Sequence, residues 1–224
     1  MLLYIIRHGE PDYETDSLTE RGRLQAEAVG KRMLDAKIDR IFSSPMGRAR
    51  QTAEPACRLL QLPCEIEEWT REVEKIIPEP YPPNTCYREN GRWDLSYAEG
   101  FDCPGIDPVG MRVAAQYVEK NGNAFLERLG YRAENGVYRI LRKNEEKIAL
   151  FCHAAFTRVW MSVLFHFPVH TMWAAFSHTH TGVTVIEFKN QESGFTAPQC
   201  LCHSDMSHLY AEKLDLLYNG EIPL

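Results

Sequence analysis

Arg7, His8 and Gly9 stand side by side directly after a short apolar run at residues 2–6. A neutral imidazole can act as a nucleophile or move a proton near neutral pH. The guanidinium group is always charged and presents a planar fork of donors that matches the oxygens of a phosphate. Gly9 has no side chain, so the backbone there can approach a ligand closely. The triplet therefore predicts a site that does chemistry on an anion.

Arg48 and His153 occur in comparable places further along the chain. Arg48 follows the apolar segment at 40–42, just inside an expected helix, and His153 ends the apolar run at 148–152. In open α/β sheets, ligands bind beyond the carboxyl ends of the strands, where helix N-termini offer unpaired N–H groups and partial positive charge. We expect both residues to join Arg7 and His8 around one anion.

The elements that must position these residues alternate between strands and helices. Short apolar runs are typical of strands buried on both faces of a parallel sheet, and periodic apolar positions after Thr19, a predicted N-cap, indicate an amphipathic helix. The pattern predicts an α/β fold with a mainly parallel central sheet flanked by helices on both faces. The expected strands are 2–6, 40–42, 65–69, 148–152 and 181–188, and the expected helices begin near Thr19, Pro45, Gly110 and Phe156.

Residues 76–110 interrupt this alternation. The segment is rich in proline and glycine, which predicts irregular structure, but its interleaved aromatic residues are unlike a solvated linker. We expect a cap inserted into a single domain spanning 1–224, with Tyr87, Arg88, Arg92 and Trp93 as candidate substrate contacts. Two smaller interruptions are predicted: a kink or early stop at Pro55, and a break at Asn121-Gly122-Asn123.

Composition limits the partners and the compartment. The 224 residues carry 25 basic and 31 acidic side chains, a formal net charge of −6, which argues against nucleic acid or an anionic membrane as the main partner. The seven cysteines are odd in number and irregularly spaced, and no secretory signal or membrane-spanning run is recognisable. These features predict reduced thiols and a cytoplasmic location.

Five segments taken together resemble the histidine phosphatase superfamily, also called the phosphoglycerate mutase-like family. They read LLYIIRHGE, LTERGRLQAE, IFSSPMGRARQTAE, IALFCHAAF and SDMSHL, in that order along the chain. The resemblance is dense over 1–57 and returns over roughly 147–209. It implies a phosphoglycerate mutase-like fold with an irregular cap insertion.

The resemblance also implies roles for the residues at matching positions. His8 would be the nucleophile that becomes a phosphohistidine, Arg7 and Arg48 would hold the phosphate oxygens, and His153 would donate a hydrogen bond to the phosphoryl group. Gly9 and Ala154, which follow the two histidines, would line the substrate site. The charges of the arginines make a metal or other cofactor unnecessary, and flanking cations keep a nucleophilic imidazole unprotonated.

A leaving alkoxide needs a proton, and the family usually places a glutamate shortly after the third strand. Glu72 fits that position best, and Glu68 is the alternative. The family often has His-Gly-Gly after the second histidine, whereas this chain has His153-Ala154-Ala155, whose methyl groups would narrow the approach.

Three functions fit this pocket. A phosphatase acting on a small phosphorylated substrate is favoured, because only EPDYETDS separates the triplet from Leu18, whereas mutases carry a longer segment there. A phosphoglycerate mutase-like phosphotransferase and a catalytically silent phosphoanion-binding module are the alternatives. The substrate and the oligomeric state stay open.

Histidines near the end of the chain leave two further questions. Cys200, Cys202, His203 and His208 suggest zinc, but their spacing does not match the common paired patterns, and alternate positions on a strand explain the cysteines more simply. One member of the His178-Thr-His180 sequence could line the pocket, and the sequence does not say which.

Overall fold

The computed structural model describes residues 1–75, 108–218 and 222–223. The predicted cap at 76–110 therefore lies almost wholly outside the described residues, together with its four candidate contacts.

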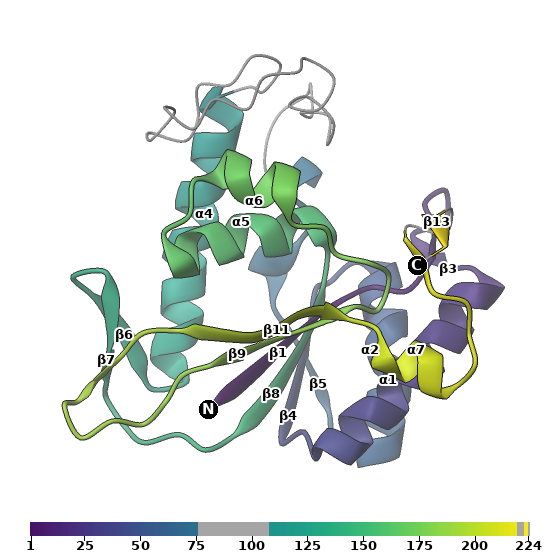
Figure 1. Cartoon of the computed structure of the whole chain (residues 1–224), viewed down its shortest axis with the longest axis horizontal. Helices are drawn as coiled ribbons and strands as arrows, with labels where there is room; N and C mark the ends of the chain where they lie inside the picture. Colours follow the sequence, from purple (N-terminus) through teal and green to yellow (C-terminus); the bar gives the residue numbers. More distant parts are fainter. Residues whose placement is uncertain (76–107, 219–221, 224) are drawn as a thin grey trace.

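A six-stranded sheet forms the centre of the molecule (Figure 1). Four neighbouring strands pair in parallel, which confirms the predicted mainly parallel sheet, and one further strand pairs antiparallel with the strand on either side of it. The order across the sheet is β11 (Gln199–Asp205), β9 (Val183–Glu187), β1 (Leu2–Arg7), β8 (Lys147–Cys152), β4 (Arg40–Ser43) and β5 (Cys64–Ile66).

Helices cover both faces of the sheet, as the sequence predicts. In β1, Leu3 and Ile5 join one apolar cluster and Ile6 joins the other, because successive side chains of a strand point to opposite faces. Helices α1 (Glu20–Ala36) and α2 (Gly47–Leu60) pack together over one face, and α4 (Pro108–Arg128) and α5 (Ala154–Phe165) over the other (Figure 1). This two-sided burial explains why the central strands are continuously apolar.

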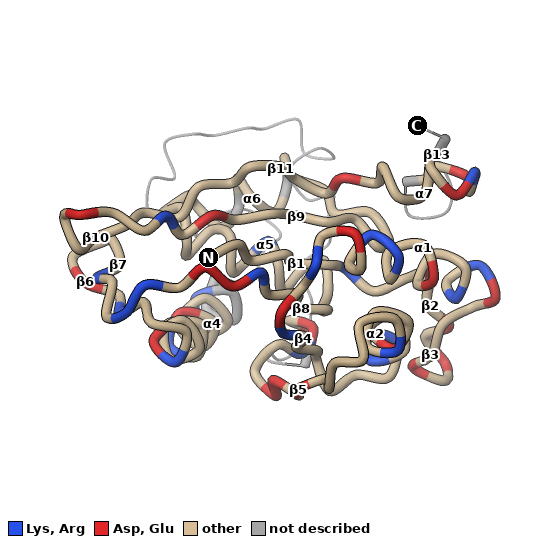
Figure 2. The backbone as a smooth tube through the Cα atoms, turned by 90° about the horizontal axis from the view of Figure 1, so that it is seen from below, with Lys and Arg blue, Asp and Glu red and all other residues tan. Residues whose placement is uncertain are grey.

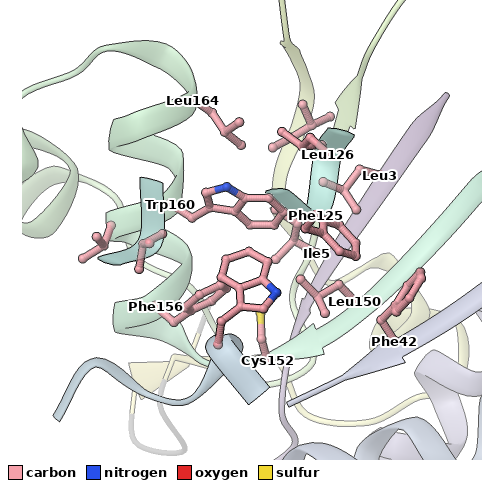
Figure 3. Close-up of a cluster of buried hydrophobic side chains, with 14 of the residues drawn as sticks. Leu3, Ile5, Phe42, Phe125, Leu126, Leu150, Cys152, Phe156, Trp160 and Leu164 are labelled. Atoms are coloured by element: carbon pink, nitrogen blue, oxygen red, sulfur yellow. The ribbon is translucent and has the colours of Figure 1, made fainter. Parts of the chain in front are cut away.

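The larger cluster is built on aromatic rings between the sheet and helices α4 and α5 (Figure 3). The ring of Trp69 meets those of Phe125, Phe156 and Trp160 at centroid distances of 5.8, 5.3 and 5.2 Å. These contacts fix the start of α5, which follows His153, against the segment that carries Glu72.

The predicted cap of α1 is confirmed. The hydroxyl oxygen of Thr19 accepts a hydrogen bond from the backbone N–H of Gly22 at 3.0 Å, which satisfies one of the free donors of the first turn. The helix ends at Ala36, and its C-cap residue Lys37 has a left-handed φ of 56°.

Several predicted boundaries are wrong. Helix α2 begins at Gly47, two residues after Pro45, and runs through Pro55 to Leu60, so the alternative of an early stop at Pro55 is wrong, whereas that of a kink stays a prediction. Helix α4 also continues through residues 121–123, where a break was expected. The third strand, expected at 65–69, is only Cys64–Ile66, because the chain turns into the short 3₁₀ helix η1 (Glu68–Thr70).

Smaller elements complete the described chain, and the sequence did not predict them as separate elements. The second sheet consists of β10 (Phe195–Thr196), β7 (Val137–Ile140) and β6 (Tyr131–Glu134). The others are β2 (Pro11–Asp12), β3 (Ser17–Leu18), η2 (Val73–Lys75), α6 (Val169–Ala175), α7 (Ser207–Ala211), β12 (Leu217–Tyr218) and β13 (Ile222–Pro223).

Charged residues of both signs are mixed along the described chain (Figure 2). Within the described segments, none of the helices combines the length and the apolar character needed to cross a bilayer.

Candidate active site

His8 follows the last residue of β1 and is buried. Its backbone N–H donates to the carbonyl oxygen of Cys152 at 2.9 Å, which ties it to the neighbouring strand. Its ring Nδ1 lies 2.7 Å from the carbonyl oxygen of Gly9. Because a carbonyl oxygen only accepts, the ring proton belongs on Nδ1, and the lone pair of Nε2 is left for chemistry.

His153 is the N-cap residue of α5 and is fully buried. Its ring lies opposite that of His8, with centroids 5.3 Å apart and planes tilted by 57°. Its Nε2 lies 2.8 Å from the hydroxyl oxygen of Ser44, whereas its Nδ1 is buried without a hydrogen-bond partner. The two predicted histidines therefore meet, as the sequence led us to expect.

The two predicted arginines are anchored by groups outside the histidine pair. Arg48 lies in the first turn of α2, where its Nη1 donates to Asp16 at 2.5 Å, and the other carboxylate oxygen of Asp16 accepts the backbone N–H of Gly47 at 2.6 Å. Arg7 ends β1, and its Nη1 donates to the carbonyl oxygen of His178 at 2.5 Å. Both guanidinium groups are thus fixed before a ligand arrives.

Burial and positive charge keep both imidazoles neutral. The pKa of His8 is well below its ordinary 6.5, first because of burial and then because of Arg7, His153 and Arg48. The pKa of His153 is likewise well below 6.5, through burial and then Arg48 and Arg7. The four residues therefore share one electrostatic environment, rich in cations, in which an anion is stabilised and a neutral His8 can act as a nucleophile.

Of the two candidate acids, only Glu72 lies beside this group. Its carboxylate oxygens accept the backbone N–H groups of Val73 (2.9 Å), Phe156 (2.8 Å) and Ala155 (3.3 Å), the last two from the first turn of α5. Burial raises its pKa above 4.5, although those hydrogen bonds and the nearby Arg7 oppose the rise. Glu68 is instead exposed and pairs with Arg71 at 2.8 Å.

Gly9 has a packing reason for being glycine in addition to the one predicted. A Cβ there would lie 2.7 Å from the carbonyl oxygen of Gly22 in α1, and the N–H of Gly9 donates to the hydroxyl of Thr52 at 2.9 Å. These contacts pack the turn after His8 against α1 and α2. The close approach of a ligand to Gly9 stays a prediction. Ala154 is half-buried at the first position of α5, directly beside His153.

His180, which the sequence left undecided, is the member of its pair that faces the site. Its ring centroid lies 5.8 Å from that of His8, and burial followed by the charges of Arg7 and Arg21 lowers its pKa to about 3. The ring of His178 instead meets that of His203 at 4.5 Å. Asp16 and Ser44 were not predicted as site residues, since a loop aspartate and a serine before proline carry no specific signal.

The residues considered for zinc do not converge. His203 approaches the carbonyl oxygen of Ser177 at 3.0 Å, His208 approaches the hydroxyl of Thr181 at 3.0 Å, and Cys200 is exposed. Across residues 1–75 and 108–218, no three His, Cys, Asp or Glu side chains are grouped so that they could hold a metal ion.

A cavity of about 890 Å³ opens beside Arg48. It carries charges of both signs and is large enough for the organic part of a small phosphorylated molecule. The described residues that line it are Tyr13, Asp16, Pro45, Met46, Arg48, Arg71 and Glu74.

The family model of the Histidine phosphatase superfamily (branch 1) matches residues 3–98 and 109–199. The chain therefore belongs to the histidine phosphatase superfamily, and the resemblance seen in its motifs is confirmed.

Curated relatives carry two kinds of name. A probable phosphoglycerate mutase GpmB from Photorhabdus laumondii is 29% identical over 107 residues, which cover 44% of this chain and 50% of the mutase. The mitochondrial serine/threonine-protein phosphatase Pgam5 of Drosophila erecta is 25% identical over 221 residues, covering 90% of this chain and 66% of the phosphatase. The matches thus span about half to two thirds of the length of these relatives.

Solved structures share the fold over almost the whole chain. Phosphoserine phosphatase from Entamoeba histolytica, in complex with 3-phosphoglyceric acid, superposes with a TM-score of 0.61 at 23% identity, covering 93% of this chain and 98% of that one. A mycobacterial glucosyl-3-phosphoglycerate phosphatase gives 0.62 at 17% identity, covering 91% and 98%. The predicted phosphoglycerate mutase-like fold is therefore confirmed.

Proposed function

We propose that this chain is a metal-independent phosphatase that hydrolyses a phosphomonoester through a phosphohistidine on His8. The observation that carries the proposal is the hydrogen bond from His8 Nδ1 to the carbonyl oxygen of Gly9. This hydrogen bond leaves the Nε2 of His8 unprotonated and close to Arg7, Arg48 and His153. The charges of the two arginines and the N–H donors of all three side chains suit the oxygens of a phosphoryl group.

In the first step, the lone pair of His8 Nε2 attacks phosphorus. The new P–N bond forms as the bond to the leaving oxygen breaks, and the proton of Glu72 passes to that oxygen. Arg7, Arg48 and His153 stabilise the equatorial oxygens, because phosphoryl transfer depends mainly on positioning and on charge stabilisation. Ala154 borders the same group from the start of α5.

In the second step, water attacks the phosphohistidine. The carboxylate of Glu72 accepts a proton from the water, the P–N bond breaks, and inorganic phosphate leaves with His8 restored. The raised pKa of Glu72 suits both steps, because it increases the protonated fraction that can act as the acid and makes the carboxylate a stronger base.

The substrate is proposed to be a small phosphorylated molecule. The phosphatase from Entamoeba histolytica, which shares the fold, binds 3-phosphoglyceric acid and, as a mutant, phosphoserine. The cavity beside Arg48 offers room for groups of that size. The five described cysteines are free, which agrees with the cytoplasmic location expected from the sequence.

A mutase is the second candidate, because the probable phosphoglycerate mutases match 44% of the chain. It would use the same phosphohistidine but return the phosphoryl group to the organic molecule rather than to water. A silent binding module is less consistent with a buried, correctly protonated nucleophile.

The test uses the full chain and an aryl phosphate, with the chelator EDTA present. We expect phosphate release together with an acid-labile, base-stable phosphoenzyme after rapid quenching. His8→Ala should abolish both, whereas His166→Asn, which changes an exposed histidine at the end of α5, should not. Equal turnover by His8→Ala would overturn the mechanism, and interconversion of phosphoglycerate isomers faster than phosphate release would favour the mutase.

A further inference from the structure

Among the described residues, Ser44 is the hydrogen-bond partner of the His153 ring. It follows β4, is fully buried, and places its hydroxyl oxygen 2.8 Å from His153 Nε2. The other ring nitrogen of His153 is buried and has no hydrogen-bond partner. A buried polar atom without a partner is costly, which indicates that a ligand supplies the missing contact.

The surroundings of Ser44 favour donation by its hydroxyl in this hydrogen bond. The backbone N–H of Met46 points at the Ser44 hydroxyl oxygen from 3.4 Å, so that oxygen accepts there and its own proton is free to donate. A neutral imidazole has one N–H and one acceptor nitrogen. When Nε2 accepts from Ser44, the ring proton must lie on Nδ1.

We propose that Ser44 is a positioning residue: its hydroxyl donates to Nε2 of His153 and fixes the tautomer in which the unpartnered Nδ1–H donates to the bound phosphoryl oxygen. Its effect on catalysis rests on the proposed phosphatase function. The assignment of the tautomer does not.

The proposal gives the two imidazoles complementary tasks from the same tautomer. His8 and His153 both carry their proton on Nδ1. In His8 that N–H donates to the carbonyl oxygen of Gly9, and the lone pair of Nε2 faces the ligand. In His153 the Nε2 accepts from the hydroxyl of Ser44, and the Nδ1–H is left to donate to the ligand. One ring is thereby a nucleophile and the other a donor, without any difference in protonation.

The neighbouring Ser43 supplies a matched control. It is equally buried, and its hydroxyl donates to the backbone carbonyl oxygen of Ser44 at 2.9 Å rather than to the histidine. Ser44→Ala should lower kcat for an aryl phosphate about 10- to 100-fold with a smaller change in KM, because the wrong tautomer cannot stabilise the transition state. Ser44→Thr should retain most activity, and Ser43→Ala should leave kcat nearly unchanged.

A spectroscopic measurement tests the role of Ser44 in fixing the tautomer of His153 independently of the proposed phosphatase function. Nitrogen-15 NMR of the histidine rings, with inorganic phosphate added, should show His153 protonated on Nδ1 in the parent chain and a mixture of tautomers in Ser44→Ala. A parent His153 protonated on Nε2, or a Ser44→Ala variant with the parent kcat, would overturn the role of Ser44. A parent chain without a phosphoenzyme would overturn the proposed function instead, while the NMR result would still decide the tautomer even if Ser44→Ala failed to fold.

Discussion

His8 and His153 face each other because of a strand register. In the parallel pair of β1 and β8, Arg7 lies beside Cys152, so each histidine is the first residue after the last matched pair. Their rings consequently lie at the same level, with centroids 5.3 Å apart. A shift of one residue would reverse the faces of one strand and separate the rings.

Arg48→Lys should lower kcat/KM for an aryl phosphate about 100-fold, the typical loss when a donor to a developing charge is removed. Lysine keeps the positive charge but has no planar fork, so it cannot hold both Asp16 and a phosphoryl oxygen in the present geometry. Steady-state kinetics provide the measurement. Arg50→Lys is the control, because Arg50 is exposed on the same helix. Similar losses in both variants would contradict a specific role for Arg48.

Glu72→Gln should slow the hydrolysis of alkyl phosphates by about 10²- to 10⁴-fold, the usual contribution of a general acid. Glutamine can still accept the N–H groups of α5 but has no proton to give. An activated aryl phosphate, whose leaving oxygen needs little protonation, should lose much less in the first step. The measurement is the rate of phosphoenzyme formation for substrates of graded leaving-group pKa.

The pH profile and a second variant check the same residue. Since burial raises the pKa of Glu72, the alkaline loss of phosphoenzyme formation should occur at a higher pH than for an ordinary glutamate with a pKa of 4.5. Glu68→Gln should behave like the parent, because Glu68 is exposed and paired with Arg71. A loss that is equal for all leaving groups would argue against proton donation by Glu72.

The ligand-free protein should become less stable as the pH falls below about 6.5. The pKa of His208 is about 3 in the folded protein, against 6.5 for a free histidine, so between these values only the unfolded chain binds the proton. Each such histidine lowers the unfolding free energy by up to about 1.4 kcal/mol per pH unit over that range. The pKa values of His8, His153, His178 and His180 are shifted in the same direction.

Urea denaturation between pH 7 and pH 4 measures this slope. The raised pKa of Glu72 acts in the opposite sense above pH 4.5, because there the folded state holds a proton that the unfolded chain has released, and it offsets part of the effect. His208→Gln should make the slope shallower, since it removes one buried histidine outside the pair at the site. A stability that is constant from pH 7 to pH 4 would contradict the prediction.

The sequence predicted best what local chemistry determines. Strands β1 and β8 are buried on both faces and therefore appear as continuous apolar runs. Thr19 caps α1 by a contact three residues away. The meeting of His8, Arg7, Arg48 and His153 was also foreseeable, because parallel strands bring their carboxyl ends to one edge. The catalytic roles of these residues remain predictions.

Two features, the continuation of α2 through Pro55 and the choice between His178 and His180, depend on tertiary contacts. Pro55 stays inside α2 because the helix is held against α1, where a Cβ on Gly30 would come within 2.8 Å of the proline ring. His180 faces His8 because Thr181, with a φ of 55°, turns the chain, and its N–H contacts the carbonyl oxygens of Arg7 and His8. No local pattern specifies either arrangement.

The hairpin of β6 and β7, which was not predicted from the sequence, has a recognisable sequence signal at its turn. Asn135 and Gly136 join β6 to β7 with φ values of 52° and 80°, the left-handed pair that favours a two-residue hairpin turn. The strands on either side alternate weakly and carry charged residues, which hid them from a search for apolar runs.

The central position of β1 has a consequence for how the protein is made. The strand that ends beside the proposed nucleophile is synthesised long before its hydrogen-bonded neighbours, β8 and β9, which begin only at Lys147 and Val183. The backbone N–H and C=O groups of β1 cannot pair within the sheet until those two strands have been synthesised. Their pairing then closes very long loops, which slows folding. A nascent chain whose synthesis has not reached β8 leaves the apolar side chains of β1 exposed, and a chaperone would be needed to shield them.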